Sequence, residues 1–525
     1  MHAGQMVTGR DPNAACAPCH REIYERYRKT PMANASGAAA DGLMPADFKH
    51  LASGIHYRVF EQAGRIWLSY ERETDGELKG RIEFKYFLGS GKRGRTYLFE
   101  QQGYWFEAPI NWYAKKQLWD MTPNYLTTKE MPLTLLVDPG CLHCHASSVA
   151  QALSDARNHY AAAPFAHGGI TCTACHGDGA KHIASGGKAK MLDIDALQPV
   201  LRDSVCLNCH LEGQAAVLRL GKQAQDFVPG DNLFDYTLYF VHRGERGSGG
   251  RATSQYEALL KSRCKQESGD RLTCTTCHDP HTSPSAAERV GFYRDRCLRC
   301  HNIAAKHHPE NPDCTACHMA RPPSNDIAHE QVTDHRIKKR VTQDALPLAT
   351  TGDLEVVGGF SASDRDLGLA YAQMAARGDS HAAARAAELL RSAEQQAEGA
   401  PRDHELHAQL GFLYQVAGLT DKAAEQYRKA LADDNYNSLA AGNLALIEAG
   451  RHHIAEATQL WEGVFSHDPV QLGAGLNLAV VQCGAGQRKS ALATLDRVLV
   501  FAPDNSQALA MTAEIRSGKR SCGKE

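Results

Sequence analysis

The pentapeptide Cys-x-x-Cys-His occurs seven times before residue 320, and no other feature constrains this chain of 525 residues as strongly. Two thiols three positions apart can each form a thioether with one vinyl group at a porphyrin edge, and the next residue's imidazole can then bind the iron. The pattern is the attachment signature of c-type haem. The copies are Cys16/Cys19/His20, Cys141/Cys144/His145, Cys172/Cys175/His176, Cys206/Cys209/His210, Cys274/Cys277/His278, Cys297/Cys300/His301 and Cys314/Cys317/His318.

Two other kinds of site use Cys-x-x-Cys pairs. Zinc sites combine such a pair with a second pair or a His-x-His element, and they need no histidine directly after it. A thioredoxin-like redox motif occurs once in a chain. The sequence therefore predicts seven covalently attached haem c groups, with the fourteen motif cysteines as attachment points and the seven motif histidines as proximal iron ligands.

Composition excludes several function classes. The net charge of -2 gives no basic footprint for nucleic acid. No stretch reaches the roughly 20 apolar residues of a membrane span. Fourteen of the 17 cysteines belong to the motifs, so no disulfide scaffold is indicated, and Cys483 and Cys522 are predicted to be inert. Covalent haem attachment takes place outside the cytoplasm, so we expect a periplasmic or extracellular protein whose leader peptide is missing from this N-terminus.

Three segments differ in composition. Residues 1–345 hold every motif and predict a heptahaem cytochrome domain with little regular secondary structure. Within it, alternating apolar and polar residues over 55–115 predict a small antiparallel β insert. Residues 346–362 mix Pro, Gly and Thr and predict a linker. Residues 363–525 are rich in Ala, Leu, Glu and Arg, and predict an all-α domain.

That helical domain repeats with a period of 34 residues. Small residues recur at this spacing in two rows, and prolines in a third: Ala423, Ala457 and Ala491; Gly411, Ala445 and Ala479; Pro469 and Pro503. This period resembles the tetratricopeptide repeat, in which small residues let paired helices approach closely. Three units over 404–505 are expected, after a degenerate unit over 364–400 and before a capping helix over 506–516. A plain helical bundle is the alternative, but a bundle has no reason to keep a fixed period.

Each iron also needs a sixth ligand or an open position. Residues 1–345 contain 20 histidines, and 13 remain after the seven proximal ones. This surplus favours bis-His electron-transfer haems. His182 and His281 lie too close in sequence to a motif histidine to reach the opposite face of the same iron, so each is expected to serve a neighbouring haem. His329 and His335 follow the last motif and are further candidate distal ligands.

Other candidates are weaker. His50, His56, His167, His242, His307 and His308 could ligate iron or be ordinary exposed or core histidines. Met32 could supply a thioether ligand, although a lone methionine more often serves packing. Cys264, ten residues before the fifth motif, could be an iron ligand, lie by an open haem or be a buried thiol.

The motif order CAPCH, CLHCH, CTACHGDGAKH, CLNCH, CTTCHDPH, CLRCH and CTACHM, followed by TDHRI, resembles multihaem cytochromes related to the tetrahaem electron acceptor of hydroxylamine oxidoreductase. The resemblance includes doubled CXXCH segments, and it implies closely stacked haem pairs and electron transfer. The chain lacks the Cys-x-x-Cys-Lys motif that marks the catalytic haem of related nitrite reductases. This difference favours electron transfer over catalysis.

These observations lead to three hypotheses. The first is an electron-transfer protein that meets a redox partner at a haem edge and binds a protein or peptide in the concave groove of its repeats. The second is a multihaem oxidoreductase acting on a small nitrogen or sulfur compound at one open haem, with Lys92, Arg93 and Arg95 attracting an anion. Such a basic turn is more often a solvated hairpin. The third is a scaffold acting through its repeats, for which deleting residues 360–525 leaves haem loading intact.

Overall fold

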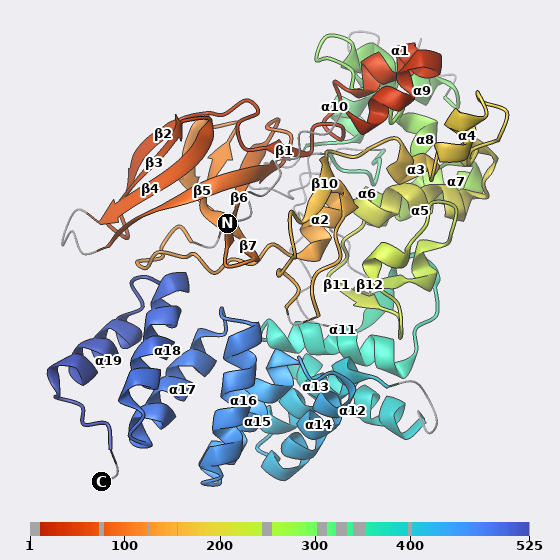
Figure 1. The fold of residues 1–525 in the computed structure, drawn as a ribbon. Coiled ribbons are helices and arrows are strands. Elements are labelled where there is room, and N and C mark those ends of the chain that lie inside the picture. The colour runs from red at the N-terminus through yellow and green to blue at the C-terminus, as the bar shows by residue number, and fades with distance from the viewer. Residues whose placement is uncertain are drawn as a thin grey trace.

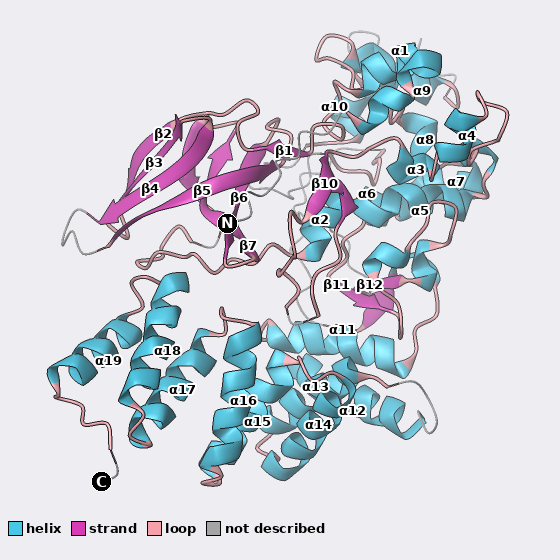
Figure 2. Ribbon diagram, in the orientation of Figure 1, coloured by secondary structure: helices cyan, strands magenta, loops and turns pink. Residues whose placement is uncertain are grey.

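A computed structural model describes residues 11–72, 78–123, 125–154, 156–243, 255–301, 312–321, 333–339, 352–396 and 402–523. Figure 1 shows three parts: a curved antiparallel sheet, a region of short helices that holds the Cys-x-x-Cys-His motifs, and an array of paired helices along the base. Strands dominate the first part and helices the third, as Figure 2 shows. Among the described residues, no helix is both long enough and apolar enough to cross a membrane.

The sheet is larger than the small insert predicted over 55–115. It has eight antiparallel strands in the order β2 to β8, with β1 paired to β5, and its edge strands β2 and β8 approach each other. The hairpin between β3 and β4 turns at Ala63 and Gly64, both at positive φ, which suits the twist of paired strands. The strands are β1 (Ser36–Ala38), β2 (Ala46–His50), β3 (Ile55–Gln62), β4 (Arg65–Arg72), β5 (Lys79–Leu88), β6 (Gly94–Gln101), β7 (Tyr104–Tyr113) and β8 (Leu118–Met121).

The region of the motifs consists of short elements, because each stretch between motifs is too brief for long ones. Its helices are α1 (Ala17–Tyr27), α2 (Pro139–His145), α3 (Thr173–His176), α4 (Ala180–Ala184), α5 (Pro199–His210), α6 (Gln255–Leu260), α7 (Arg263–Ser268), α8 (Cys274–Cys277), α9 (Arg289–Leu298) and α10 (Cys314–His318). Its strands are β9 (Ala146–Val149), β10 (Phe165–Gly168), β11 (Ala215–Leu218) and β12 (Thr237–His242).

The segment predicted as a linker, 346–362, is in part structured. Its residues 352–362 contain β13 (Leu354–Val356), which pairs with β12 so that Val356 lies opposite Phe240. Leu354 and Val357 are buried in the adjoining core. Strand β13 could not be recognised in the sequence because its three residues lie among Gly, Pro and Thr, which are typical of a linker. The remaining residues of the predicted linker, 346–351, lie outside the described part of the chain.

The C-terminal region is all helical, as the period predicted. The first helices of successive pairs start at residues 404, 438, 472 and 506, and the second helices at 420, 454 and 488, so both series keep the 34-residue step. The helices are α11 (Asp364–Ala376), α12 (Ser380–Gln396), α13 (His404–Val416), α14 (Thr420–Asp433), α15 (Ser438–Gly450), α16 (Ile454–His467), α17 (Leu472–Gly484), α18 (Arg488–Phe501) and α19 (Ser506–Ser517).

The regular spacing of small residues has a steric cause. Ala423, Ala457 and Ala491 are fully buried where the paired helices meet. A Cβ added to Gly411 would lie 2.7 Å from the ring of Tyr427 on the partner helix, closer than atoms can pack. Glycine at this position therefore lets α13 and α14 approach with a tyrosine between them.

The helical array contacts the rest of the molecule at both ends. At one end, Leu369 and Leu390 share a core with Val217 and Phe240 of the β11–β12 sheet. At the other end, Phe501 joins the core of the large sheet, and the Asp504 carboxylate accepts hydrogen bonds from Arg72 and from the backbone N–H of Met131.

Cys483 and Cys522 form a disulfide that holds the C-terminal tail against α17. The prediction that both are inert was wrong. Two spare cysteines 39 residues apart carry no signal of pairing in the sequence, because pairing depends on the path of the tail after α19.

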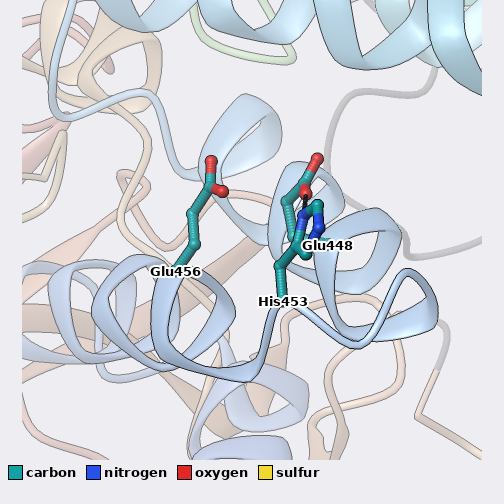
Figure 3. Close-up of side chains that lie close together, drawn as sticks. All are labelled: Glu448, His453 and Glu456. Carbon is teal, nitrogen blue, oxygen red and sulfur yellow. Dashed lines mark hydrogen bonds and ion pairs between the residues drawn. The ribbon is translucent and has the colours of Figure 1, made fainter.

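A buried carboxylate links three repeat helices (Figure 3). The Glu448 side chain is fully buried, and its carboxylate accepts hydrogen bonds from Arg428 and Arg451 at 2.9 Å and lies 2.6 Å from His453 Nδ1. Glu456 also pairs with Arg428, at 3.4 Å. Although Glu448, His453 and Glu456 offer possible metal ligands, the two guanidinium groups occupy the carboxylates. We interpret the group as an ion-pair network that ties α14, α15 and α16 together.

Replacing Glu448 by glutamine is expected to lower the free energy of unfolding by about 2–3 kcal/mol, since Arg428 and Arg451 lose the buried carboxylate that they share. The loss is not larger because Arg428 keeps Glu456 and Arg451 keeps Asp421 as ion-pair partners. Burial alone would raise the pKa of Glu448, but the His453 hydrogen bond and the charges of Arg428 and Arg451 lower it below 4.5. The carboxylate's contribution is thus complete above the unfolded pKa, and it is lost as the pH falls from there through the lowered folded pKa. Denaturant titrations at pH 7 and pH 4 test this, with the exposed Glu425→Gln as matched control; an equal loss in both variants would contradict it.

Candidate haem-binding site

Each motif forms one helical turn. The backbone N–H of the motif histidine donates to the carbonyl of the first motif cysteine, at 2.9 Å for His20 and 3.0 Å for His176, His278 and His301. Positions i, i+3 and i+4 of a helical turn share one face. Both thiols and the imidazole therefore project from the same side, as a porphyrin attached at its edge and ligated at its iron requires.

All seven motifs line one continuous cavity of about 4490 Å³. A pocket for one small ligand has roughly 300–1,000 Å³, so this cavity has room for several large ones. The motif residues on its wall include Cys16, His20, Cys141, His145, Cys172, His176, Cys206, His210, Cys274, His278, Cys297, His301, Cys314 and His318. Size and lining both fit a group of haems.

Neighbouring motifs touch through their thiols. Cys16 lies against Cys172, which joins the first motif to the third. In the same way Cys206 meets Cys274, and Cys144 meets Cys209. The fourth motif thus adjoins both the fifth and the second.

Three pairs of imidazoles face each other across the cavity. The ring centroids of His20 and His182 are 6.3 Å apart with 19° between the ring planes. His176 and His281 are 6.0 Å apart at 14°. His278 and His335 are 6.2 Å apart at 27°.

The separation of these rings has a simple chemical meaning. A metal–imidazole bond is about 2 Å long, and the ligating nitrogen lies about 1.1 Å from its ring centroid. Two imidazoles on opposite faces of one metal ion therefore have centroids about 6.2 Å apart. Each of the three pairs leaves room for one iron.

The Nδ1 nitrogen of each of these three non-motif histidines lies beside an oxygen, by a hydrogen bond in His182 and His335 and by an ion-pair contact in His281. Nδ1 of His182 lies 2.7 Å from the carbonyl oxygen of Ala189, and Nδ1 of His335 lies 3.0 Å from that of Thr333. Nδ1 of His281 is 3.3 Å from the Asp279 carboxylate. Such partners fix the ring and leave Nε2 as the ligating atom, as around histidine metal ligands in general.

Burial keeps several of these histidines neutral. It lowers the pKa of His210 and His335, and it lowers the pKa of His278 to about 4, with a further contribution from the nearby His335. A neutral imidazole retains the lone pair that a metal needs.

The other candidates are divided between cavity and sheet. Met32, Cys264 and His242 line the cavity, and burial raises the pKa of Cys264, so that residue is a neutral thiol. His50 and His56 instead lie in the large sheet, where they contact Ser53 and Asp47 respectively. His307, His308 and His329 fall outside the described residues.

The basic turn between β5 and β6 reaches the cavity only in part. Lys92 and Arg93 line it, and Lys92 Nζ donates to Ser283 Oγ at 3.4 Å, two residues after His281. Arg95 points elsewhere: it donates to the carbonyl of Gly42 and stacks 3.9 Å from the centroid of the Phe87 ring.

One part of the wall was not anticipated from the sequence. Gln373, Met374 and Arg377, from the end of α11 and the turn after it, line the cavity beside the fourth motif. Arg377 donates to the carbonyl of Gln214 at 2.6 Å, and Gln373 donates to that of Ala216 at 2.8 Å. The 34-residue period identifies α11 as a repeat helix but gives no sign of what its outer face contacts.

Comparison with known proteins gives one family match. The doubled CXXCH motif matches residues 267–306, which contain the fifth and sixth motifs. No curated protein sequence matches the chain. Among solved structures, MamA of AMB-1 is 23% identical, covering 30% of this chain and 80% of its own, with a TM-score of 0.26. A tetratricopeptide repeat protein from Parabacteroides merdae is 18% identical, covering 28% and 58%, with a TM-score of 0.25. The doubled motif indicates that the chain binds haem c.

Proposed function

We propose that this protein is an exported electron-transfer cytochrome that carries seven haem c groups. The observation that carries the proposal is the set of three imidazole pairs, each spaced for one bis-His iron. An iron with two imidazole ligands has no free position for a substrate, so it suits electron relay. When bound, haem c supplies an iron that cycles between Fe(III) and Fe(II).

The pairs also link motifs that are distant in sequence. His182 follows the third motif and faces the first, His281 follows the fifth and faces the third, and His335 follows the seventh and faces the fifth. This crossed ligation would hold successive haems close together, in the order first, third, fifth and seventh. The contact of Cys206 with Cys274 would join the fourth motif to this series, and that of Cys144 with Cys209 would add the second motif to the same branch.

The intact mass of the purified protein tests the cofactor count. We expect a mass increase of seven haem groups over the polypeptide, and six in a variant with Cys16 and Cys19 both replaced by alanine. The covalent bonds survive denaturation, so the count does not depend on folding. Fewer than seven haems in the unchanged protein, with full processing of the chain, would contradict the proposal.

Export rests on two observations. Covalent haem attachment takes place outside the cytoplasm, and the Cys483–Cys522 disulfide is of the kind that persists in oxidising compartments. Cell fractionation followed by intact-mass measurement tests this: the haem-loaded chain should be found in the periplasmic or secreted fraction, and haem-loaded protein in the cytoplasmic fraction alone would contradict export.

The repeats offer a surface for a protein or peptide partner. Leu446 and Val480 occupy equivalent positions in α15 and α17, and they are 47% and 43% exposed. Repeat arrays bind extended partners along such rows. Replacing both residues by aspartate should abolish the partner complex while haem content stays unchanged; a complex that survives would contradict a docking role for this row.

One observation favours the alternative function, a multihaem oxidoreductase for a small nitrogen or sulfur compound. Lys92 and Arg93 bring positive charge to the cavity wall, where an anion could approach an open iron. Such an enzyme requires at least one high-spin haem that responds to nitrite, hydroxylamine or sulfite. All-low-spin spectra that none of these compounds changes would exclude it.

A further inference from the structure

The last two motifs each place one cysteine at the protein surface. Cys300 and Cys317 are exposed, whereas the second cysteines of the second to fifth motifs are half-buried. Cys19 of the first motif is the one other exposed motif cysteine. Electrons cross between proteins where a cofactor edge comes near the surface, so the first, sixth and seventh motifs are the places to look for a docking face.

The surface at the sixth and seventh motifs is basic. Helix α9 leads into the sixth motif and packs against α10 of the seventh, and Figure 1 shows the two helices together at one end of the molecule. Five arginines near these motifs line the cavity, and one of them, Arg296, stacks on the ring of Phe292. We call the other four the α9 arginine patch: Arg289, Arg294, Arg299 and Arg321.

These arginines have no counter-charge in the part of the chain that the structure describes. None of the four forms an ion pair there, and Arg289, Arg299 and Arg321 are exposed. The adjacent acids form no ion pair with them: the Asp313 carboxylate accepts hydrogen bonds from the first N–H groups of α10, and that of Glu288 accepts one from the N–H of Ser285. Asp295 is the remaining acid on α9. The helix and its C-cap residue also contain four arginines, namely Arg289, Arg294, Arg296 and Arg299.

The surface at the first motif is different. On α1, acids and bases alternate, and Arg28 pairs with Glu25 at 3.4 Å. A surface of mixed charge beside a haem edge provides little electrostatic steering for a charged partner. Unpaired charges of one sign, by contrast, attract an oppositely charged protein to that part of the surface.

We propose that the α9 arginine patch is the docking face for a redox protein with an acidic surface. The inference rests on the proposed electron-transfer function and adds to it the place of exchange and the charge of the partner. At this face, one electron passes between the partner's redox centre and a haem iron of the sixth or seventh motif, one centre being oxidised as the other is reduced. No proton or atom is transferred.

The test uses the haem-loaded full chain and a reduced, acidic [2Fe–2S] ferredoxin as the probe, with haem reduction followed by stopped-flow absorbance. The second-order rate constant is expected to fall at least about 10-fold as ionic strength rises from low salt to about 0.3 M, since screening removes steering. A variant with Arg289, Arg294 and Arg299 all replaced by glutamate is expected to lose at least about 10-fold at low salt and most of the salt dependence.

A matched variant replaces Arg21 and Arg26 of α1 and its C-cap residue Arg28 by glutamate. It changes the net charge of the chain by the same amount beside the other exposed motif, and it should keep the rate within about threefold of the unchanged protein. Because Arg299 is exposed, the milder Arg299→Gln should lower the rate by about threefold while haem content stays unchanged. Unaltered rates in the patch variants, or equal losses in both triple variants, would overturn the assignment.

Two further measurements separate the possible failures. Dithionite reduction of every haem tests the electron-transfer function itself and does not depend on docking. If the patch variants lose haem or shift the potential of one haem while ferredoxin rates stay unchanged, the arginines neutralise haem propionates, and the docking proposal is wrong although the relay stands.

Discussion

Replacing His182 by alanine is expected to open one iron of the reduced protein to carbon monoxide. The His182 ring faces that of His20 at 6.3 Å, and the Ala189 carbonyl oxygen lies at its Nδ1, so the substitution leaves His20 as the only imidazole of that pair. A titration of the dithionite-reduced protein should show one more carbon monoxide bound per chain than in the unchanged protein. The absorption spectrum should gain the corresponding high-spin component. His281→Ala and His335→Ala should each open one further iron, so a double variant should bind two.

His56→Ala is the matched control for these variants. His56 lies in the large sheet, with its Nε2 2.6 Å from the Asp47 carboxylate, and it does not line the cavity. Its loss should leave the titration unchanged. If His182→Ala keeps all its haem and binds no extra carbon monoxide, then His182 is not the ligand opposite His20, and the crossed ligation between the first and third motifs is wrong.

The sequence alone indicated haem c, which the doubled motif supports, and it predicted the attachment residues, but it gave no order for the haems. The motif is local, since one helical turn brings Cys16, Cys19 and His20 to one face. The spacing after the third motif also indicated that His182 serves a neighbouring haem. Which neighbour it would serve depends on how α1 and α4 are placed around the cavity, where the rings of His20 and His182 come within 6.3 Å, and no sequence pattern reports that placement.

Regular repeats were similarly easy to predict, and single contacts were not. Every repeat helix after residue 403 begins on the 34-residue step, because the period records contacts between neighbouring helices. The edge strands of the large sheet, β2 and β8, lie outside the predicted range 55–115. Each is only four or five residues long, so its alternation of apolar and polar residues is too short to recognise in the sequence. The strand in the predicted linker and the Cys483–Cys522 disulfide depend on single partners far away in the chain.

Ending the chain after Gly359 is expected to abolish stable haem loading around the fourth motif, contrary to the expectation for independent repeats. Val217, Leu238 and Phe240 share one continuous core with Leu369 and Leu390 of the first repeat pair. Each large apolar side chain that loses its burial costs about 1.5–3 kcal/mol, and a folded domain has only about 5–15 kcal/mol in total. The truncation also removes Arg377 and Met374 from the cavity wall.

A smaller deletion, which ends the chain after Asp434, separates the contribution of α11 to the cavity wall from partner docking. It keeps α11 to α14, and with them the core shared with the β11–β12 sheet, but it removes Leu446, Val480 and the contact of Asp504 with Arg72. We expect this variant to carry the full set of haems by intact mass and to give low-spin spectra, with a lower melting temperature for the large sheet. The protein that ends after Gly359 should not reach this state. If it also shows full haem content and unchanged spectra, α11 is not needed for the haem cavity, and the repeats would act only as a separate docking module.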